Sequence, residues 1–116
     1  MKHLEDKVVI VTGASSGIGE ATARRLAESG VRVVLAARSM ETLTDVADAI
    51  ERDGGSAHVV RTDVTVEDDV NNLVKETIDV HGRLDGLVNN AGLIDVAPVS
   101  DADMGDWASM LEVNLQ

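Results

Sequence analysis

Residues 7–19 read KVVIVTGASSGIG, an apolar run that passes directly into a glycine-rich turn. The run from Lys7 to Thr12 is almost continuously apolar and β-branched, which predicts a strand buried on both faces, as in a parallel sheet. Glycines at positions 13, 17 and 19 predict a tight turn that opens a helix over residues 17–29, with Gly30 as its stop. This order of strand, turn and helix sets the first unit of the fold.

The same alternation continues along the chain. Further strands are expected at residues 31–37, 57–62 and 84–89, each of them short and rich in apolar side chains. An amphipathic helix follows the second strand, because apolar residues recur at i, i+3, i+4 and i+7, and a glycine pair closes it. The residues concerned are Leu43, Val46, Ala47, Ile50 and Gly54-Gly55.

Two more helices complete the pattern. Thr65 and Asp68 resemble a capping box at the start of one of them, although Asp stands where Glu or Gln is usual. The last helix is expected from a second Ser-x-x-Asp signal followed by apolar residues at helical spacing. These residues are Ser100, Asp103, Met104, Trp107, Leu111 and Leu115.

The alternation βαβαβαβα predicts an open, doubly wound α/β fold. Strands joined by helices run parallel with right-handed crossovers, and helices cover both faces of such a sheet. In sheets of this kind ligands bind outside the carboxyl ends of the strands, where the strand order reverses. Functional residues are therefore expected just after each strand.

Composition excludes several classes of function. The 116 residues hold 21 acidic against 10 basic side chains, a net charge of -11, which disfavours nucleic acids and anionic membranes as partners. The first seven residues show no secretory signal, and no apolar run approaches the ~20 residues that span a bilayer. We therefore expect a cytoplasmic protein. Cysteine is absent, and His3, His58 and His81 lack metal-ligand spacing and are expected on the surface, so no metal site is predicted.

The glycine turn itself indicates an anion site. Backbone N–H groups at the start of a helix surround a negative charge, and the helix dipole adds to the attraction. A phosphate-binding Walker loop is excluded, since Glu20 and Ala21 stand where Lys and Ser or Thr would be required. The spacing Gly-x-x-x-Gly-x-Gly also departs from the general dinucleotide fingerprint. A tight turn without any ligand stays open as an alternative.

Four segments together resemble the short-chain dehydrogenase/reductase family. Thr12-Gly-x-x-x-Gly17-Ile18-Gly19 is similar to its coenzyme motif, and Asp63-Val64 to its adenine-contacting segment after the third strand. Asn89-Asn90-Ala91-Gly92 matches the signature after the fourth strand. Val113-Asn114-Leu115 matches a segment on the helix that follows. The resemblance implies a Rossmann fold and hydride transfer between a nicotinamide dinucleotide and a carbonyl or alcohol carbon.

The resemblance also implies site residues. Asn114 corresponds to a member of the family's catalytic tetrad. The expected cofactor-binding residues are Gly13, Ser15, Ser16, Gly17, Ile18, Gly19, Arg38, Ser39, Asp63, Val64, Asn90, Ala91 and Gly92. Two of the matched residues have structural alternatives: Asp63 could cap the turn into the next helix, and Asn89 could tie the fourth strand to the glycine turn.

The end of the second strand favours NADP(H) over NAD(H). An acidic residue there binds the ribose 2′-hydroxyl of NAD, whereas an Arg accommodates the 2′-phosphate of NADP. This chain has Ala37 followed by Arg38, whose planar guanidinium suits a phosphate, and Ser15 and Ser16 could add hydroxyl contacts. The alternative is that Arg38 is a solvated residue at a strand end.

Catalysis is expected to need more than this chain contains. The resemblance implies a Ser and a Tyr-x-x-x-Lys, yet the chain has no tyrosine and ends at Gln116. Residues 1–116 are thus expected to form a dinucleotide-binding half-domain of about four strands, without the catalytic part. Its fourth strand would lie at an edge in the order 3-2-1-4, favouring self-association there and through the last helix. The alternatives are a standalone nucleotide-binding or protein-interaction module, and a structural domain that binds nothing.

Overall fold

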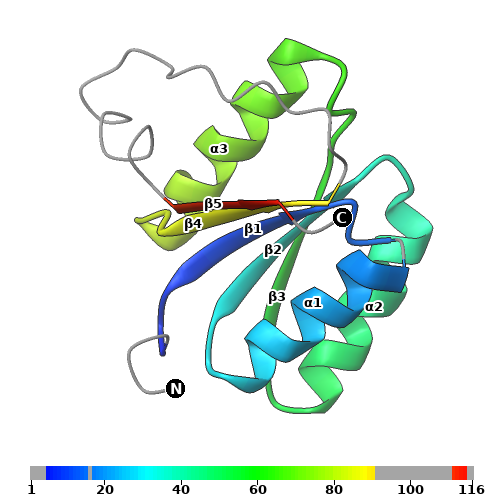
Figure 1. The fold of residues 1–116 in the computed structure, drawn as a ribbon, viewed down its shortest axis with the longest axis vertical. Helices are drawn as coiled ribbons and strands as arrows, with labels where there is room; N and C mark the ends of the chain where they lie inside the picture. The colour runs from blue at the N-terminus through cyan, green and yellow to red at the C-terminus, as the bar shows by residue number, and fades with distance from the viewer. Residues whose placement is uncertain (1–4, 16, 91–110, 115–116) are drawn as a thin grey trace.

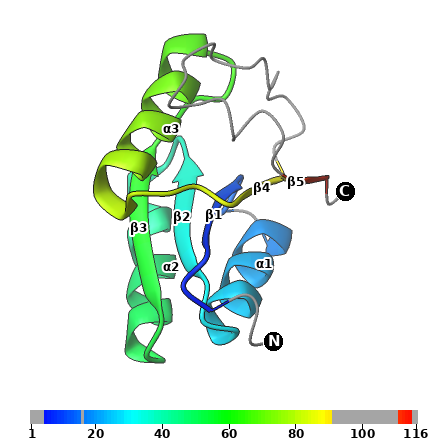
Figure 2. The same cartoon turned by 90° about the vertical axis from the view of Figure 1, so that its left-hand side faces the viewer.

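A five-stranded parallel sheet runs through the centre of the molecule. The computed structural model describes residues 5–15, 17–90 and 111–114. The strands are β1 (Val8–Thr12), β2 (Arg32–Ala37), β3 (Ser56–Arg61), β4 (Gly86–Asn89) and β5 (Leu111–Asn114), in the order β3-β2-β1-β4-β5. Figure 2 shows this sheet with β3 at one end and β5 at the other.

Helices cover both faces of the sheet. α1 (Gly17–Glu28) and α2 (Met40–Arg52) lie on one face, and α3 (Glu67–His81) lies on the opposite face (Figure 1). Side chains of the strands alternate between two buried clusters, because successive residues of a strand point to opposite faces. Val11 and Leu35 join the α1 and α2 side, whereas Ile10 and Val34 join the α3 side. The doubly wound α/β fold is thereby confirmed.

The strand order reverses beside β1. The chain passes from β1 to β2 and β3 on one side, and α3 then carries it back to β4 on the other side of β1. Val9–Thr12 pair with Gly86–Asn89 in parallel register. The carboxyl ends of β1 and β4 therefore flank the position where ligands bind in sheets of this kind.

The first three strand–helix units agree with the sequence patterns. The stripe of Leu43, Val46, Ala47 and Ile50 is buried, as expected for α2. Gly30 has a φ of 90° and donates its N–H to the Ala27 carbonyl at 3.0 Å, so it ends α1 as predicted. Each observed strand from β1 to β4 starts and ends within two residues of its predicted bounds.

The capping box predicted at Thr65 and Asp68 is wrong. Val66 is the N-cap of α3 and makes no side-chain cap hydrogen bond. The Thr65 hydroxyl and N–H instead donate to Asp63 Oδ1, at 2.6 and 2.9 Å. Asp63 lies two residues back, where its short side chain forms a local turn more readily than a helix cap.

The placement of Asn114 on a helix is also wrong. Leu111–Asn114 form β5, which pairs in parallel with β4 and sets Asn114 opposite Asn89. The helical spacing of Leu111 and Leu115 competes with a strict apolar–polar alternation over residues 111–114, and the unpaired edge of β4 favours the strand. β4 is consequently an inner strand, so the self-association expected at its edge loses that basis. The rest of the predicted last helix lies outside the described residues.

Two histidines expected on the surface, His58 on β3 and His81 at the end of α3, are half-buried, and His3 lies outside the described residues. His58 Nε2 lies 2.9 Å from Glu76 Oε2, and the rings of His58 and His81 stand 5.9 Å apart. Burial lowers the pKa of His81, and the charges of His58 and Arg32 lower it further.

In the described part of the chain no group of three His, Asp or Glu is placed to hold a metal. No described helix is long and apolar enough to cross a membrane.

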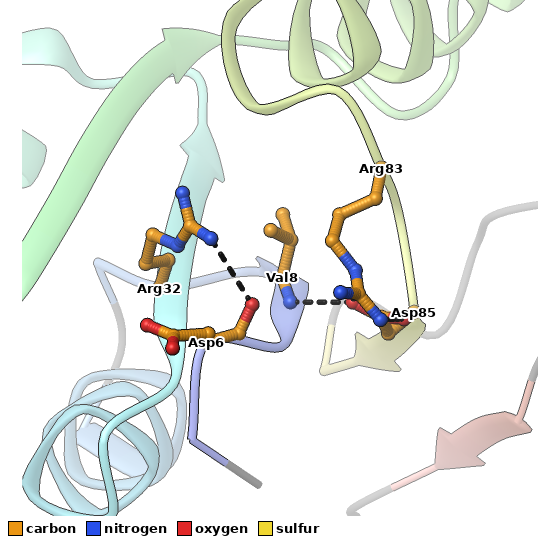
Figure 3. A network of polar contacts seen from close by, with 5 residues as sticks. All are labelled: Asp6, Val8, Arg32, Arg83 and Asp85. Carbon is orange, nitrogen blue, oxygen red and sulfur yellow. Dashed lines mark hydrogen bonds and ion pairs between the residues drawn. The ribbon is translucent and has the colours of Figure 1, made fainter.

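Hydrogen bonds join the amino ends of the central strands (Figure 3). The Val8 N–H donates to Asp85 Oδ2 at 2.8 Å, and the Asp85 N–H donates to the Val8 carbonyl at 2.8 Å. Arg83 Nε and Nη2 each donate to an oxygen of the same carboxylate at 2.8 Å. Burial disfavours the ionised carboxylate, but the hydrogen bonds from Arg83 and Val8 outweigh it and lower the pKa of Asp85.

Replacing Asp85 by Asn should reduce the free energy of unfolding by about 1–2 kcal/mol at pH 7, since the charged hydrogen bonds from Arg83 are lost. A carboxyl with a lowered folded pKa stabilises above its unfolded pKa of about 4, and this stabilisation is lost as the pH falls through the folded value. Urea unfolding followed by circular dichroism at pH 7 and pH 3 measures the difference.

Asp79→Asn is the matched control. Asp79 pairs with Lys75 at 2.9 Å, but both side chains are more than half exposed, at 61% and 73%. Its loss should cost less than about 0.5 kcal/mol. Equal costs for the two variants at pH 7 would contradict the role given to Asp85.

Candidate functional site

Three glycines shape the turn between β1 and α1. Gly13 has a φ of 63°, a left-handed conformation that favours glycine, and it turns the chain at the end of β1. A Cβ on Gly19 would collide with the carbonyl group of Gly13, so α1 starts directly against the turn. A Cβ on Gly17 would meet nothing within 4 Å, which leaves its backbone open to an incoming group. Gly13 thus turns the chain, Gly19 allows α1 to pack closely against the turn, and Gly17 leaves the backbone accessible.

Thr12 ties this turn to β4. Its hydroxyl lies 3.1 Å from Asn89 Oδ1 and 3.3 Å from the Val88 carbonyl oxygen, and it accepts the Asn90 N–H at 3.1 Å. Thr12 and Asn89 are both buried. Asn89 therefore contacts β1 through Thr12, which agrees with the structural alternative predicted for it from the sequence.

A cleft of about 420 Å³ opens at the carboxyl ends of β1, β2 and β3. It collects residues from three loops that are far apart in the sequence. The lining residues are Gly13, Ser15, Ala37, Arg38, Ser39, Thr62, Asp63, Val64 and Thr65. Six of the predicted cofactor-binding residues thus line one cleft.

The other predicted residues lie elsewhere. Gly17, Ile18 and Gly19 form the start of α1 and are not part of the cleft lining, and Ile18 is 58% exposed. Asn90 follows β4, and Asn114 ends β5 opposite Asn89. Ser16, Ala91 and Gly92 lie outside the described residues.

Asn90 carries polar atoms that the described residues do not satisfy. Its side-chain oxygen and nitrogen are both buried without a hydrogen-bond partner in the described part of the chain. A buried amide without partners is costly, so such groups usually mark a place where a ligand or water binds. This amide lies at the end of β4, beside the reversal of strand order.

Charge is arranged unevenly around the cleft. Hydrogen bonds from the Thr65 hydroxyl and N–H lower the pKa of Asp63, and the charges of Arg38 and Arg61 lower it further. Arg38 is exposed and forms no ion pair or side-chain hydrogen bond with a described residue. Ala37 beside it is buried and apolar. The cleft thus presents the exposed guanidinium of Arg38 next to the apolar side chain of Ala37.

Ser39 and Asp63 also have local structural roles. Ser39 is the N-cap of α2, and its hydroxyl accepts the Thr42 N–H at 3.4 Å. The Asp63 N–H donates to Asp69 Oδ2 at 2.9 Å, which holds the loop after β3 against α3. Asp63 thus makes the turn contacts expected of its structural alternative, and its second carboxylate oxygen accepts no hydrogen bond from a described residue.

Three residues that line the cleft were not among the expected cofactor-binding residues: Ala37, Thr62 and Thr65. Ala37 ends β2 and Thr62 directly follows β3, and this position at a strand end is the signal that could have identified them. Thr65 lies farther along the loop, where its hydrogen bonds to Asp63 hold it. A profile of the family described as "short chain dehydrogenase" matches residues 7–116.

The chain belongs to the short chain dehydrogenase family. It is 42% identical over 113 residues to the uncharacterized oxidoreductase Lin0452 of Listeria innocua, covering 97% of this chain and 46% of the relative. The chain spans about half the length of the curated relatives it matches. Members of this family bind nicotinamide cofactors.

Solved structures share the fold and differ in cofactor. NAD+-bound xylitol dehydrogenase superposes with a TM-score of 0.74 at 38% identity, over 78% of this chain and 35% of that one. A variant of actinorhodin polyketide ketoreductase with NADPH superposes with a TM-score of 0.70 at 36% identity, over 77% and 38% of the two chains. The two structures are about equally similar to this chain, yet one holds NAD+ and the other NADPH. Similarity to these structures therefore does not determine which dinucleotide this chain binds.

Replacing Gly19 by Ala should destabilise the protein by about 1–3 kcal/mol, because the added methyl group forces α1 away from Gly13. Gly17→Ala is the matched control. Its methyl group enters open space in the first turn of α1, where Ala is the better helix former. Thermal unfolding should therefore show a clear loss for Gly19→Ala and none for Gly17→Ala, and equal losses would contradict the packing role.

Proposed function

We propose that residues 1–116 bind NADP(H) at the carboxyl ends of β1 to β4, as the coenzyme-binding half of a short chain oxidoreductase. The observation that carries this proposal is the cleft in which Arg38 stands unpaired beside the glycine turn. The reaction of the whole enzyme would be hydride transfer between the nicotinamide and a carbonyl or alcohol carbon.

The residues present fit a dinucleotide along the edge of the sheet. The open backbone at Gly17 and the N-terminus of α1 suit the pyrophosphate, and Ser15 lines the cleft beside the glycine turn. Ser16 is proposed for the same end of the site from its place in the sequence motif. Arg38, Ser39, Asp63 and Val64 suit the adenosine end. Exposed Ile18 and the unsatisfied amide of Asn90, followed by Ala91 and Gly92, suit the nicotinamide end.

Arg38 supports NADP(H) over NAD(H). Its guanidinium offers paired N–H donors to a phosphate, and no described carboxylate neutralises it by an ion pair. NAD-binding members of dinucleotide folds place an acidic side chain after β2, but here the position before Arg38 is the buried Ala37.

Turnover would require groups that residues 1–116 do not contain. The nicotinamide supplies the hydride when bound, and a proton donor must meet the substrate oxygen. The chain has no tyrosine, and Asn114 is its one residue matching the catalytic tetrad. Lys75 does not replace the donor, since it pairs with Asp79 on the exposed side of α3. We therefore propose that this chain binds the dinucleotide without reducing or oxidising a substrate by itself.

A second candidate is a standalone binding module that uses the same cleft. Mixing this chain with a complementary C-terminal half from a relative distinguishes the two: restored oxidoreductase activity supports the enzyme half, and binding without restoration supports the module. We further propose that the protein acts in the cytoplasm and self-associates through β5, which is an end strand of the sheet among the described residues. Sedimentation velocity of residues 1–116 measures the oligomeric state of the chain in solution.

Arg38→Asp should weaken NADPH binding about 10–100-fold, because a charged hydrogen bond to the 2′-phosphate is replaced by repulsion. NADH, which lacks this phosphate, should change by less than about 3-fold. Calorimetric titration of both dinucleotides measures the two dissociation constants. Arg25→Asp, on the last turn of α1, is the charge-matched control. Equal losses for NADPH and NADH would contradict the assignment of the phosphate to Arg38.

A further inference from the structure

Arg61 lies next to the cleft on the neighbouring strand. It is the last residue of β3, and the parallel register sets it opposite Ala37, the last residue of β2. Residues paired in this way project from the same face of a sheet. Ala37 lines the cleft, and the Thr62 N–H donates to the Ala37 carbonyl at 2.9 Å, which fixes the two strand ends together.

The guanidinium of Arg61 is not committed to a partner. Arg61 is exposed and makes no side-chain hydrogen bond or ion pair with any described residue. Arg24 pairs with Glu20, Arg83 pairs with Asp85, and Arg32 donates to the Asp6 carbonyl. Arg25 also makes no side-chain hydrogen bond or ion pair with a described residue, but it lies on the last turn of α1, away from this edge. The carboxyl edge of β2 and β3 therefore holds two uncommitted guanidinium groups, those of Arg38 and Arg61.

Both cations act on the same carboxylate. After the hydrogen bonds from Thr65, the charges of Arg38 and then Arg61 contribute to lowering the pKa of Asp63. Asp63 lines the cleft, so both guanidinium groups lie within electrostatic reach of its interior. The chain as a whole has a net charge of -11 and therefore repels anions. The guanidinium groups of Arg38 and Arg61 make this edge of the sheet locally more favourable for an anion.

We propose that Arg61 is a second specificity-determining cation for the 2′-phosphate of NADP(H), acting together with Arg38. This inference rests on the proposed function, because it assumes that the adenosine end occupies the cleft. A phosphate has three terminal oxygens and accepts more donors than one guanidinium supplies, so a second Arg adds both hydrogen bonds and charge. Discrimination between NADP(H) and NAD(H) would thereby depend on Arg61 at the end of β3 as well as on Arg38 in the loop after β2.

The test compares Arg61→Gln, Arg38→Gln and the double variant with the unchanged chain, in titrations with NADPH and NADH. Arg61→Gln should weaken NADPH about 3–10-fold and leave NADH within about 2-fold, as one exposed charge contact is lost. Its NADPH affinity should also fall less steeply with added salt, because one fewer cation contacts phosphate. Arg61→Lys should recover part of the affinity, since it keeps the charge and loses the planar fork.

Arg25→Gln is the matched control, as it removes an exposed arginine from α1 at no cost to the cleft. Unchanged circular dichroism shows that Arg61→Gln folds. NADPH binding equal to the unchanged chain in Arg61→Gln, alongside weakened binding in Arg38→Gln, would overturn the role of Arg61 alone. No preference for NADPH in the unchanged chain would instead overturn the proposed function.

Discussion

The close contact between α1 and the turn after β1 is the constraint on which the rest of the structure depends. Gly19 leaves no room for a side chain against Gly13, so the helix starts within backbone contact of the strand end. This contact brings the N-terminus of α1 to the carboxyl edge of the sheet. There the open backbone of Gly17 and the helix dipole create a place for an anion before any side chain contributes.

Polar contacts hold the two central strands at both ends, and these contacts position the edge. Thr12 joins β1 to Asn89 and Asn90 near the cleft, while Asp85 joins β4 to Val8 at the opposite end. With β1 and β4 aligned in this way, the loops after β1, β2 and β3 converge. Strand register then places Arg61 opposite Ala37, the residue that precedes Arg38.

Local patterns were sufficient for much of this structure. The apolar run before Gly13 and the stripe of α2 predicted buried elements, and the strand ends predicted which residues line the cleft. Prediction failed at two places for different reasons. Leu111–Asn114 pair with the distant strand β4 rather than continuing a helical spacing. Thr65 bonds Asp63 in a local turn rather than capping α3, because two local hydrogen-bond patterns compete at this position. Arg61 was missed because its place beside Ala37 follows from register, which no local pattern shows.

A titration of the ¹⁵N-labelled chain with NADPH, followed by amide chemical shifts, tests directly whether the dinucleotide binds at the carboxyl edge of the sheet. The amides of Gly13, Arg38 and Asp63, at that edge, should shift together with one dissociation constant. The amides of Asp53 and Gly55, beyond the far end of α2, should not move. Shifts confined to that far end, or no shifts at saturating NADPH, would contradict binding at the carboxyl edge.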